Sequence, residues 1–315
     1  MGEHASLADA HSHKLAFGRV MGELAQARRD LAVVVSDYGR RLGLERFREL
    51  CPEGYVQCGI AEQNQVEVAS ALANEGFATF APTYATFITA RVLDQVRVNL
   101  GIMGSPVVLV GVGCGCEAGP LGPSHMAIED LGCMRQIPGM TVASPVDVEG
   151  FMDVLRELAA HPRPAYVRMN DDAGLRLSAG KDPLSPRWLR RGDGRVALVT
   201  CGTIAANALG AADVLAAHGV GADVLATPCL KPWDQDVVRG LSGYELVVTV
   251  EEHAAIGGLG SAVAETLAEL GAGPRLLRLG TPDRYLEADV RARLLARMGL
   301  DAAGIARAVE GALGR

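Results

Sequence analysis

The chain has 315 residues, 49% of them hydrophobic, and a formal net charge of −7. A chain of this length is longer than a domain with a single hydrophobic core usually is, so the sequence predicts two domains. The negative charge argues against nucleic acid or an anionic membrane surface as a partner.

Cysteine usage and hydropathy indicate a cytoplasmic protein. The seven cysteines are scattered, and no two have the C-x-x-C spacing of a zinc site. We therefore expect reduced thiols. The amino-terminal segment has no apolar run of signal-peptide length, and the longest apolar run, 106–116, is too short to span a bilayer. The sequence thus predicts a cytoplasmic location and no membrane partner.

Through the first 170 residues, short β-branched runs alternate with helical periodicity, which predicts βαβ units and a mostly parallel sheet. The predicted strands are 31–36, 55–59, 77–80, 106–112, 140–143 and 165–169. The predicted helices are 14–27, 62–75, 88–102, 125–134 and 147–159.

A second α/β set follows a segment rich in Gly, Pro, Ser and Arg, which is typical of an interdomain linker. Its predicted strands are 195–200, 222–227, 245–250 and 275–280, and its predicted helices are 204–218, 258–270 and 301–313. The fold prediction is an α/β protein with two parallel-sheet domains, residues 1–180 and 195–315, joined by a linker at 181–194.

One carboxylate stands out at a predicted strand-to-helix junction. In GIAEQN (59–64), Glu62 opens the helix 62–75. An acid in the first turn of a helix interacts favourably with the helix dipole, which is one explanation for its presence. A catalytic acid in a pocket without water is the other explanation, and spacing alone does not separate the two.

Two further stretches follow predicted strands. A Gly- and Pro-rich loop after strand 106–112 places His125 at the predicted start of a helix, where it is a candidate acid–base group or a simple helix cap. Tyr84 and Phe87 lie between a strand and a helix, where core packing is the simpler explanation for an aromatic residue.

Several motifs occur in one order at suitable intervals: GIAEQN, the TF-x(3)-R-x-x-DQVR pattern within 82–97, GPSHMAIEDL and RQIPGM. Together they resemble the pyrimidine-binding half of the transketolase family. The segment 248–265 resembles the last domain of that family. The resemblance extends from about residue 12 to residue 313.

The resemblance implies thiamine diphosphate as the cofactor, with Glu62 as the glutamate that hydrogen-bonds ring nitrogen N1′ of the aminopyrimidine. Burial penalises the charged form of a carboxyl group, so a sheltered carboxyl can share a proton with the ring. Phe87 matches the aromatic residue that stacks on this ring. Tyr84 matches a neighbouring wall position, and Asp37 matches an acid at the end of the first strand that faces the cofactor.

The resemblance also implies substrate contacts. His125 matches a histidine that contacts a substrate hydroxyl or carbonyl oxygen, so it is both a catalytic and a substrate-binding candidate. Arg168 matches an arginine that holds a substrate phosphate or another anion. Arg91 resembles an arginine of the related deoxyxylulose-phosphate synthases, although a helix-surface charge explains it equally well.

The substrate pattern of the family is altered at three positions. Leu121 stands where an acid usually contacts a substrate hydroxyl, and His13 stands where an arginine usually holds the acceptor phosphate. Met126 replaces the usual Gln after the histidine. We therefore expect a changed acceptor, less polar or carrier-bound, in secondary metabolism.

The metal site of the family is missing from the predicted pattern. The family binds its metal through Gly-Asp-Gly and a later Asn. The one Gly-Asp-Gly here, 192–194, lies in the predicted linker, and the last asparagine, Asn207, follows too closely. We expect no metal site in this chain. Mg²⁺ or Ca²⁺ would be held by an N-terminal transketolase subunit carrying the diphosphate-binding domain, in a dimer of heterodimers with large apolar interfaces.

The sequence therefore favours the C-terminal subunit of a split transketolase, which moves a two-carbon ketol unit from a ketose to an aldehyde-type acceptor. A thiamine-dependent enzyme acting on a 2-oxo acid, similar to deoxyxylulose-phosphate synthases or to the β subunits of 2-oxo-acid dehydrogenases, is the alternative. A third interpretation is that the chain is a non-catalytic partner subunit.

The predicted C-terminal domain has one Gly-rich helix start. Gly257, Gly258 and Gly260 precede a helix and suggest either an anion site or close packing at a subunit contact, of which packing is favoured. His253 is expected in a loop of that contact.

Overall fold

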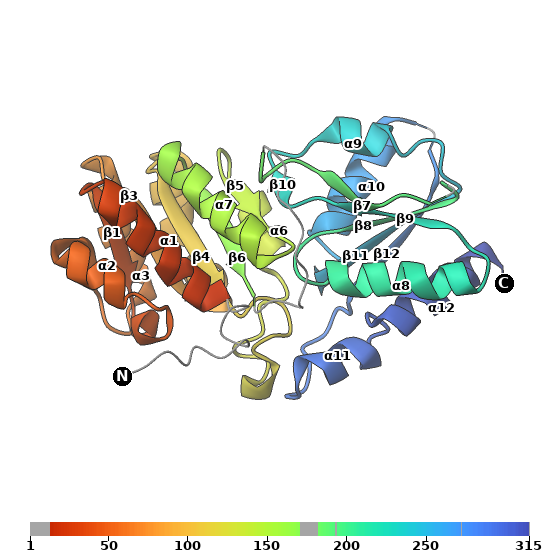
Figure 1. Cartoon of the computed structure of the whole chain (residues 1–315), viewed down its shortest axis with the longest axis horizontal. Helices are drawn as coiled ribbons and strands as arrows, with labels where there is room; N and C mark the ends of the chain where they lie inside the picture. The colour runs from red at the N-terminus through yellow and green to blue at the C-terminus, as the bar shows by residue number, and fades with distance from the viewer. Residues whose placement is uncertain (1–12, 171–181, 193, 272, 315) are drawn as a thin grey trace.

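The computed structural model describes residues 13–170, 182–192, 194–271 and 273–314. Figure 1 shows two α/β lobes side by side, the amino-terminal one coloured red to lime and the carboxyl-terminal one green to blue. Each lobe is built around one sheet, so the predicted α/β architecture of two mainly parallel sheets is confirmed.

The first sheet has the order β10-β5-β6-β4-β3-β1-β2, and only β10 runs antiparallel to its neighbour. Every residue of β1, β4 and β6 is buried, as expected for a parallel sheet covered on both faces. Its strands are β1 (Leu31–Val35), β2 (Tyr55–Gln57), β3 (Ala78–Tyr84), β4 (Val107–Val112), β5 (Thr141–Ala143), β6 (Ala165–Met169) and β10 (Cys229–Lys231).

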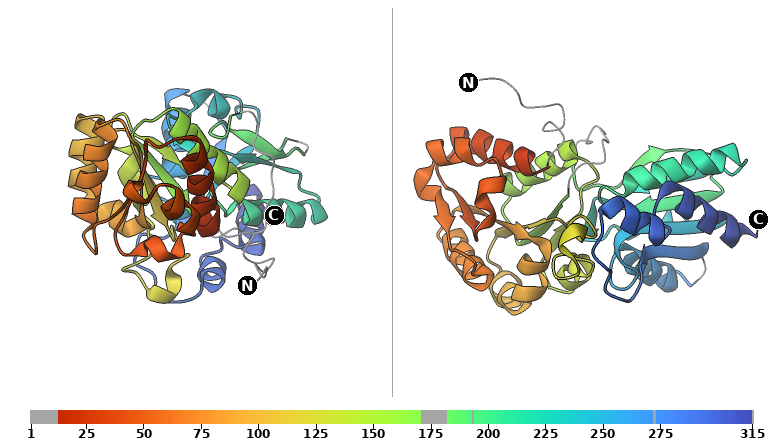
Figure 2. Two further views of the ribbon diagram at one scale, coloured as in Figure 1. Left: turned by 60° about the vertical axis from the view of Figure 1, so that its left-hand side comes forward. Right: turned by 90° about the horizontal axis from the view of Figure 1, so that it is seen from below.

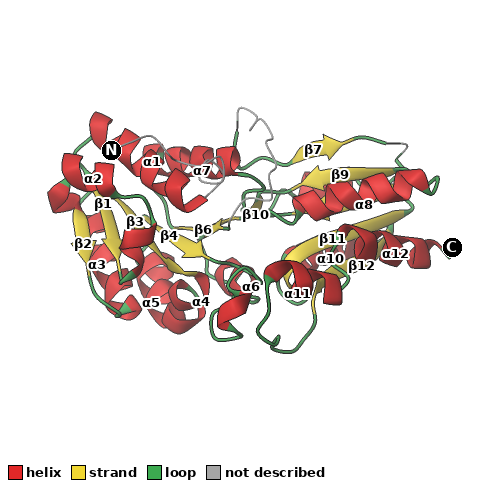
Figure 3. Ribbon diagram, turned by 60° about the horizontal axis from the view of Figure 1, so that its bottom comes forward, coloured by secondary structure: helices red, strands yellow, loops and turns green. Residues whose placement is uncertain are grey.

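Helices cover both faces of this sheet (Figure 3). One face carries α1 (His13–Ala27), α2 (Glu45–Leu50) and α7 (Val148–Ala160). The other face carries α3 (Glu62–Asn74), α4 (Ala85–Ile88), α5 (Leu93–Val96), a π-helical turn η5 (Arg97–Ile102) and α6 (Asp130–Arg135). Short 3₁₀ turns complete the lobe: η2 (Tyr38–Arg41), η3 (Pro52–Gly54), η4 (Ala90–Val92) and η6 (Gly119–Leu121).

The second sheet has the order β12-β11-β8-β9-β7, with β7 antiparallel at one edge. Its strands are β7 (Arg187–Arg190), β8 (Val196–Thr200), β9 (Ala222–Ala226), β11 (Leu246–Ala254) and β12 (Arg275–Thr281). Figure 2 shows this lobe from two further sides. Its helices are α8 (Ala205–Ala217), α9 (Gln235–Arg239), α10 (Leu259–Glu269), α11 (Arg291–Arg297) and α12 (Ala302–Leu313).

One hydrophobic cluster joins the two lobes, in addition to the cluster that each lobe has of its own. A single cluster of buried side chains joins α3, α4 and β4 of the first lobe to β8, β11 and α10 of the second. Strand β10 belongs by sequence to the second half, yet it pairs with β5 of the first sheet. The lobes are therefore packed as parts of one folded unit rather than joined by a free linker.

Some predicted elements differ from the structure. Residues 187–190, inside the predicted linker 181–194, form edge strand β7 because they pair with β9. The predicted helix 88–102 is divided into α4, η4, α5 and η5, and the predicted helix 125–134 begins only at Asp130. The predicted end of the first domain at residue 180 lies outside the described residues.

No helix among the described residues is long and apolar enough to cross a bilayer.

Candidate cofactor and substrate site

The candidate residues gather at the carboxyl edge of the first sheet. Tyr84 ends β3, Asp37 follows β1, and His125 lies in the loop after β4. Parallel α/β sheets bind ligands at this edge, because the loops that follow neighbouring strands meet there.

Glu62 is the first residue of α3, and its side chain is almost completely buried, with 4% of the residue exposed. The start of α3 is tied to the sheet by Gln65, whose amide nitrogen donates to Val34 O at 2.8 Å and to Pro82 O at 3.2 Å. Glu62 Oε2 accepts a hydrogen bond from Arg91 Nη1 at 3.0 Å. The carboxylate is thus held in a fixed place and sheltered from water.

An aromatic cluster lies at the same edge. The ring of Tyr84 is 5.8 Å from Phe87 and 5.1 Å from His125, and Phe87 is 5.1 Å from His125, all in edge-on arrangements. Tyr38 of η2 packs against Tyr84 at 4.8 Å. Burial raises the pKa of Tyr38, so it is a neutral wall residue at physiological pH. Arg91 lies over the Phe87 ring, 3.8 Å from its centroid.

His125 sits in a loop rather than at a helix start, because α6 begins five residues later. Its Nδ1 is 3.0 Å from Ser124 Oγ. The second lobe holds this loop on both sides of the histidine: Cys116 N donates to Glu252 Oε1 at 2.8 Å, and Ala254 N donates to Ile128 O at 2.7 Å. The carboxyl-terminal lobe therefore positions the His125 loop.

Three further predicted site residues, His13, Leu121 and Asp37, differ in their exposure. His13 is 1% exposed and packs against Phe151 of α7 at 5.1 Å, so it faces the interior between two helices. Leu121 is 53% exposed in η6. Asp37 is exposed, and its nearest recorded polar contact is Ser36 Oγ at 3.5 Å.

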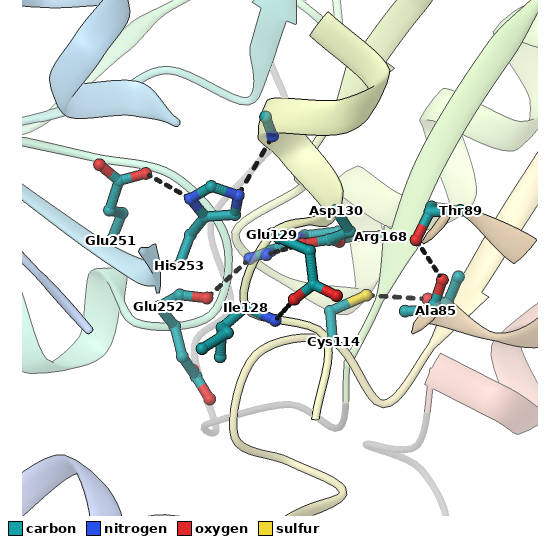
Figure 4. Close-up of polar contacts among 12 residues, drawn as sticks. Ala85, Thr89, Cys114, Ile128, Glu129, Asp130, Arg168, Glu251, Glu252 and His253 are labelled. Carbon is teal, nitrogen blue, oxygen red and sulfur yellow. Dashed lines mark hydrogen bonds and ion pairs between the residues drawn. The ribbon is translucent and has the colours of Figure 1, made fainter. Parts of the chain in front are cut away.

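Arg168 is placed differently from the expectation. It is 5% exposed, its Nε donates to Asp130 Oδ2 at 2.8 Å, Nη2 also donates to Asp130, and Nη1 donates to Glu252 O at 3.1 Å. Figure 4 shows this pair between the two lobes. Burial opposes ionisation of Asp130, but the Arg168 charge outweighs burial and lowers the pKa of Asp130. An arginine bound in this way does not suit a substrate phosphate; it links the lobes.

His253 is also different from the expectation: it lies in β11, fully buried, and not in a loop (Figure 4). Its Nε2 accepts a hydrogen bond from Gly132 N of α6 at 3.1 Å, and its Nδ1 lies 2.7 Å from Ala254 O. Burial lowers the pKa of His253, so the ring is neutral and carries its proton on Nδ1. The histidine joins β11 to α6 within one chain.

The Gly-rich helix start is occupied by the chain's own carboxylate. Glu251 Oε2 and Oε1 accept hydrogen bonds from Leu259 N at 2.7 Å and Gly260 N at 2.8 Å. A Cβ atom on Gly258 would lie only 2.0 Å from Glu251 Oε2, so glycine is required there. This is close packing inside the chain, which leaves no room for an external anion.

Sequence reasoning missed the supporting residues. Gln65 follows Glu62 by three positions, and Tyr38 follows Asp37 directly, so both stood beside residues that the motifs had marked. Glu252 could not be found in this way, because its contact with Cys116 spans 136 positions of sequence.

Comparisons with known proteins show which family the chain belongs to. The family description "Transketolase, pyrimidine binding domain" matches residues 10–173, and "Transketolase, C-terminal domain" matches residues 188–305. The chain belongs to the transketolase family. Membership makes it a transketolase-like transferase subunit that depends on thiamine diphosphate.

Two transketolase relatives match nearly end to end. The 6-deoxy-6-sulfo-D-fructose transketolase subunit SqwH of Clostridium sp. (strain MSTE9) is 36% identical over 91% of this chain and 90% of its own length. A solved split-gene transketolase, an inactive β4 tetramer, superposes with a TM-score of 0.84 and 32% identity, over 96% and 98% of the two chains. The 1-deoxy-D-xylulose-5-phosphate synthase 1 of Geobacter sulfurreducens is 34% identical, but the chain spans only 48% of its length.

The transketolase-type site fits the aminopyrimidine of the cofactor. Glu62 and the face of Phe87 already hold a flat, conjugated N–H donor, the Arg91 guanidinium. An aminopyrimidine is also flat and conjugated, so it would lie on the same aromatic face and share a proton with the same carboxyl group. The described residues contain no group of three or more His, Cys, Asp and Glu side chains that could hold a metal ion, and Asp193 of the Gly-Asp-Gly lies outside them.

Proposed function

We propose that this transketolase-family chain supplies the pyrimidine-binding half of a thiamine-diphosphate active site, at which a two-carbon ketol unit moves from a ketose donor to an aldehyde-type acceptor. The observation that carries the proposal is the buried Glu62 carboxylate next to the face of Phe87, at the ligand-binding edge of the sheet. Bound thiamine diphosphate supplies a carbanion-stabilising carbon.

Each residue then has a defined task. Glu62 would hydrogen-bond ring nitrogen N1′ of the pyrimidine and share one proton with it, at a place where water does not compete for that hydrogen bond. Phe87 and Tyr84 fix the plane of the ring. His125, between these aromatics and open to the loop side, donates or accepts a proton at a substrate oxygen. Asp37, in the loop after β1, faces the cofactor from the next strand end.

The site needs a second polypeptide. A diphosphate binds tightly only where a cation or several oriented amides neutralise it. We assign these groups to an N-terminal transketolase subunit that carries Mg²⁺ or Ca²⁺, in a cytoplasmic dimer of heterodimers. The full-length similarity to a subunit of a sulfofructose transketolase and to a split-gene transketolase supports this assignment.

The substrate pocket lacks the usual charges for a phosphorylated aldose. Leu121 is an exposed apolar residue at the position expected for an acid, and His13 is turned into the interior at the position expected for an acceptor arginine. The buried pair of Arg168 with Asp130 removes a further cation from substrate binding. We therefore propose an acceptor other than an ordinary aldose phosphate.

The proposal is tested with the chain co-purified with its N-terminal partner. Ketose donors, including fructose 6-phosphate and 6-deoxy-6-sulfo-D-fructose, are compared with pyruvate. We expect ketol transfer from a ketose, and Glu62→Gln should lower kcat by about 10²- to 10⁴-fold, because it removes proton sharing. The control Glu75→Gln, at the exposed end of α3, should leave the rate unchanged.

The same assay separates the alternatives. Turnover of pyruvate in place of ketoses would favour a 2-oxo-acid enzyme. Unchanged activity in Glu62→Gln would indicate a non-catalytic partner subunit. A normal rate with ribose 5-phosphate as acceptor would contradict the altered acceptor pocket.

A further inference from the structure

Arg91 makes two contacts at the candidate pyrimidine site at once. Its guanidinium carbon lies 3.8 Å from the centroid of the Phe87 ring, and its Nη1 donates to Glu62 Oε2 at 3.0 Å. The Glu62 side chain is 5% exposed, whereas the Arg91 side chain is 45% exposed. The cation thus reaches from solvent across the aromatic face to a sheltered carboxylate.

These contacts have the geometry of a flat ring ligand. A guanidinium is planar and delocalised, carries its N–H donors in the plane, and stacks on aromatic faces. An aminopyrimidine bound as in the proposed function would stack on Phe87 and hydrogen-bond Glu62 in the same manner. Both groups cannot occupy the Phe87 face and the Glu62 oxygen together.

We propose that Arg91 is a placeholder: in the cofactor-free chain it occupies the pyrimidine position, and it swings outward when thiamine diphosphate binds. This inference rests on the proposed function of the Glu62–Phe87 site. Until the cofactor binds, the arginine charge neutralises the Glu62 carboxylate and covers the Phe87 ring.

The position of Arg91 in the chain permits this movement. It belongs to η4, a 3₁₀ helix of one turn between the short helices α4 and α5. Its long side chain is open to solvent on one side. Neither contact is strong at a partly exposed site, since a cation–π contact and an exposed ion pair each contribute modestly. The placeholder should therefore weaken cofactor binding by about tenfold and not abolish it.

The first test measures cofactor binding by calorimetry, with thiamine diphosphate and Mg²⁺ added to the chain assembled with its N-terminal partner. Arg91→Met keeps the length of the side chain and removes its charge and its planar group. We expect the Kd for the cofactor to fall about tenfold in Arg91→Met. Arg97→Met is the matched control, because Arg97 is 60% exposed and pairs with Asp94 at 3.7 Å; its Kd should not change.

The outcomes are distinct. Absence of cofactor binding by the wild-type assembly would refute the proposed function itself. An unchanged Kd in Arg91→Met would overturn the placeholder, and a weaker Kd would show that Arg91 holds the cofactor instead of competing with it.

A second test uses the isolated chain and no cofactor. The Nε–H resonance of Arg91, observed in ¹⁵N-edited spectra, should be displaced by the ring current of Phe87. Phe87→Leu should remove that displacement, while the Nε–H resonance of Arg97 stays in place. An Arg91 signal that is the same in wild type and Phe87→Leu would overturn the inference.

Discussion

Asp130 and Arg168 are charges that water does not reach, at 0% and 5% side-chain exposure. Replacing Arg168 by Met leaves the Asp130 carboxylate buried without its counter-charge. We expect a loss of about 3–5 kcal/mol in the free energy of unfolding, measured by urea titration. The double variant Arg168→Met/Asp130→Leu should recover much of this loss, because no unpaired charge remains.

A surface pair provides the control for this buried pair. Arg163 and Glu157 are each 31% exposed and 3.4 Å apart. Arg163→Met should cost no more than about 1 kcal/mol. Equal losses in Arg168→Met and Arg163→Met would contradict the argument from burial.

Single residues could be predicted where a local motif marks them. The sequence motifs marked Glu62, Tyr84, Phe87 and His125, and the structure brings these four together, although their roles stay predictions. The pairing of Arg168 with Asp130 could not be predicted, because the two residues lie 38 positions apart and no local pattern reveals the contact. The same reason explains His253, whose contact with Gly132 spans 121 positions.

A titratable carboxyl group of β11, Glu251, accepts hydrogen bonds from the start of helix α10. Burial raises the pKa of Glu251 to about 7, although the amide donors of Gly260 and Leu259 lower it. Because the folded pKa lies above the value of 4.5 for an exposed Glu, the folded chain keeps a proton that the unfolded chain releases. Stability from this group is present below pH 4.5 and is lost as the pH rises through about 7.

Glu251→Gln should therefore remove a fall in the free energy of unfolding between about pH 5 and pH 8, worth up to about 3 kcal/mol. His253, 3.7 Å away, acts in the opposite direction, because its lowered pKa makes stability decrease as the pH falls below 6.5. The measurement is urea unfolding at several pH values. Glu265→Gln, on the exposed face of helix α10, is the control, and an identical pH profile for Glu251→Gln and wild type would refute the prediction.

Most strands could be predicted from the sequence, but the edge strands β7 and β10 could not. Each predicted strand is present, and β1, β4, β6, β8 and β9 are wholly buried. Strands β7 and β10 have only four and three residues and lie at sheet edges, and neither is wholly buried. The predicted helix 88–102 is broken near Thr89, where Thr89 Oγ1 donates to Ala85 O at 2.6 Å and the backbone leaves the helical region.

The whole molecule should unfold in one step, because one hydrophobic cluster spans both lobes. Trp188 lies in β7, and Trp233 Nε1 donates to Thr266 Oγ1 of α10 at 2.9 Å, so the fluorescence of the two tryptophans follows the second lobe. Far-UV circular dichroism follows both lobes. We expect the two signals to give the same urea midpoint. Separate midpoints would show that the lobes are independent domains.

The two-lobe plan could be predicted from alternating strands and helices, but the dependence of one lobe on the other could not. The contacts that join them are carried by side chains and by strand β10, far apart in sequence from their partners. The segment rich in Gly and Pro was interpreted from its composition as an interdomain linker, which carries no information on these contacts.

Strand β10 is synthesised long after β5, the strand with which it pairs. During translation, β5 emerges roughly ninety residues before the segment 229–231 that pairs with its open edge. Nascent chains on neighbouring ribosomes therefore expose a short unpaired edge during that interval, and such an edge is a point for wrong association between chains. Production of this subunit should benefit from slower elongation or from chaperones that bind the emerging first lobe.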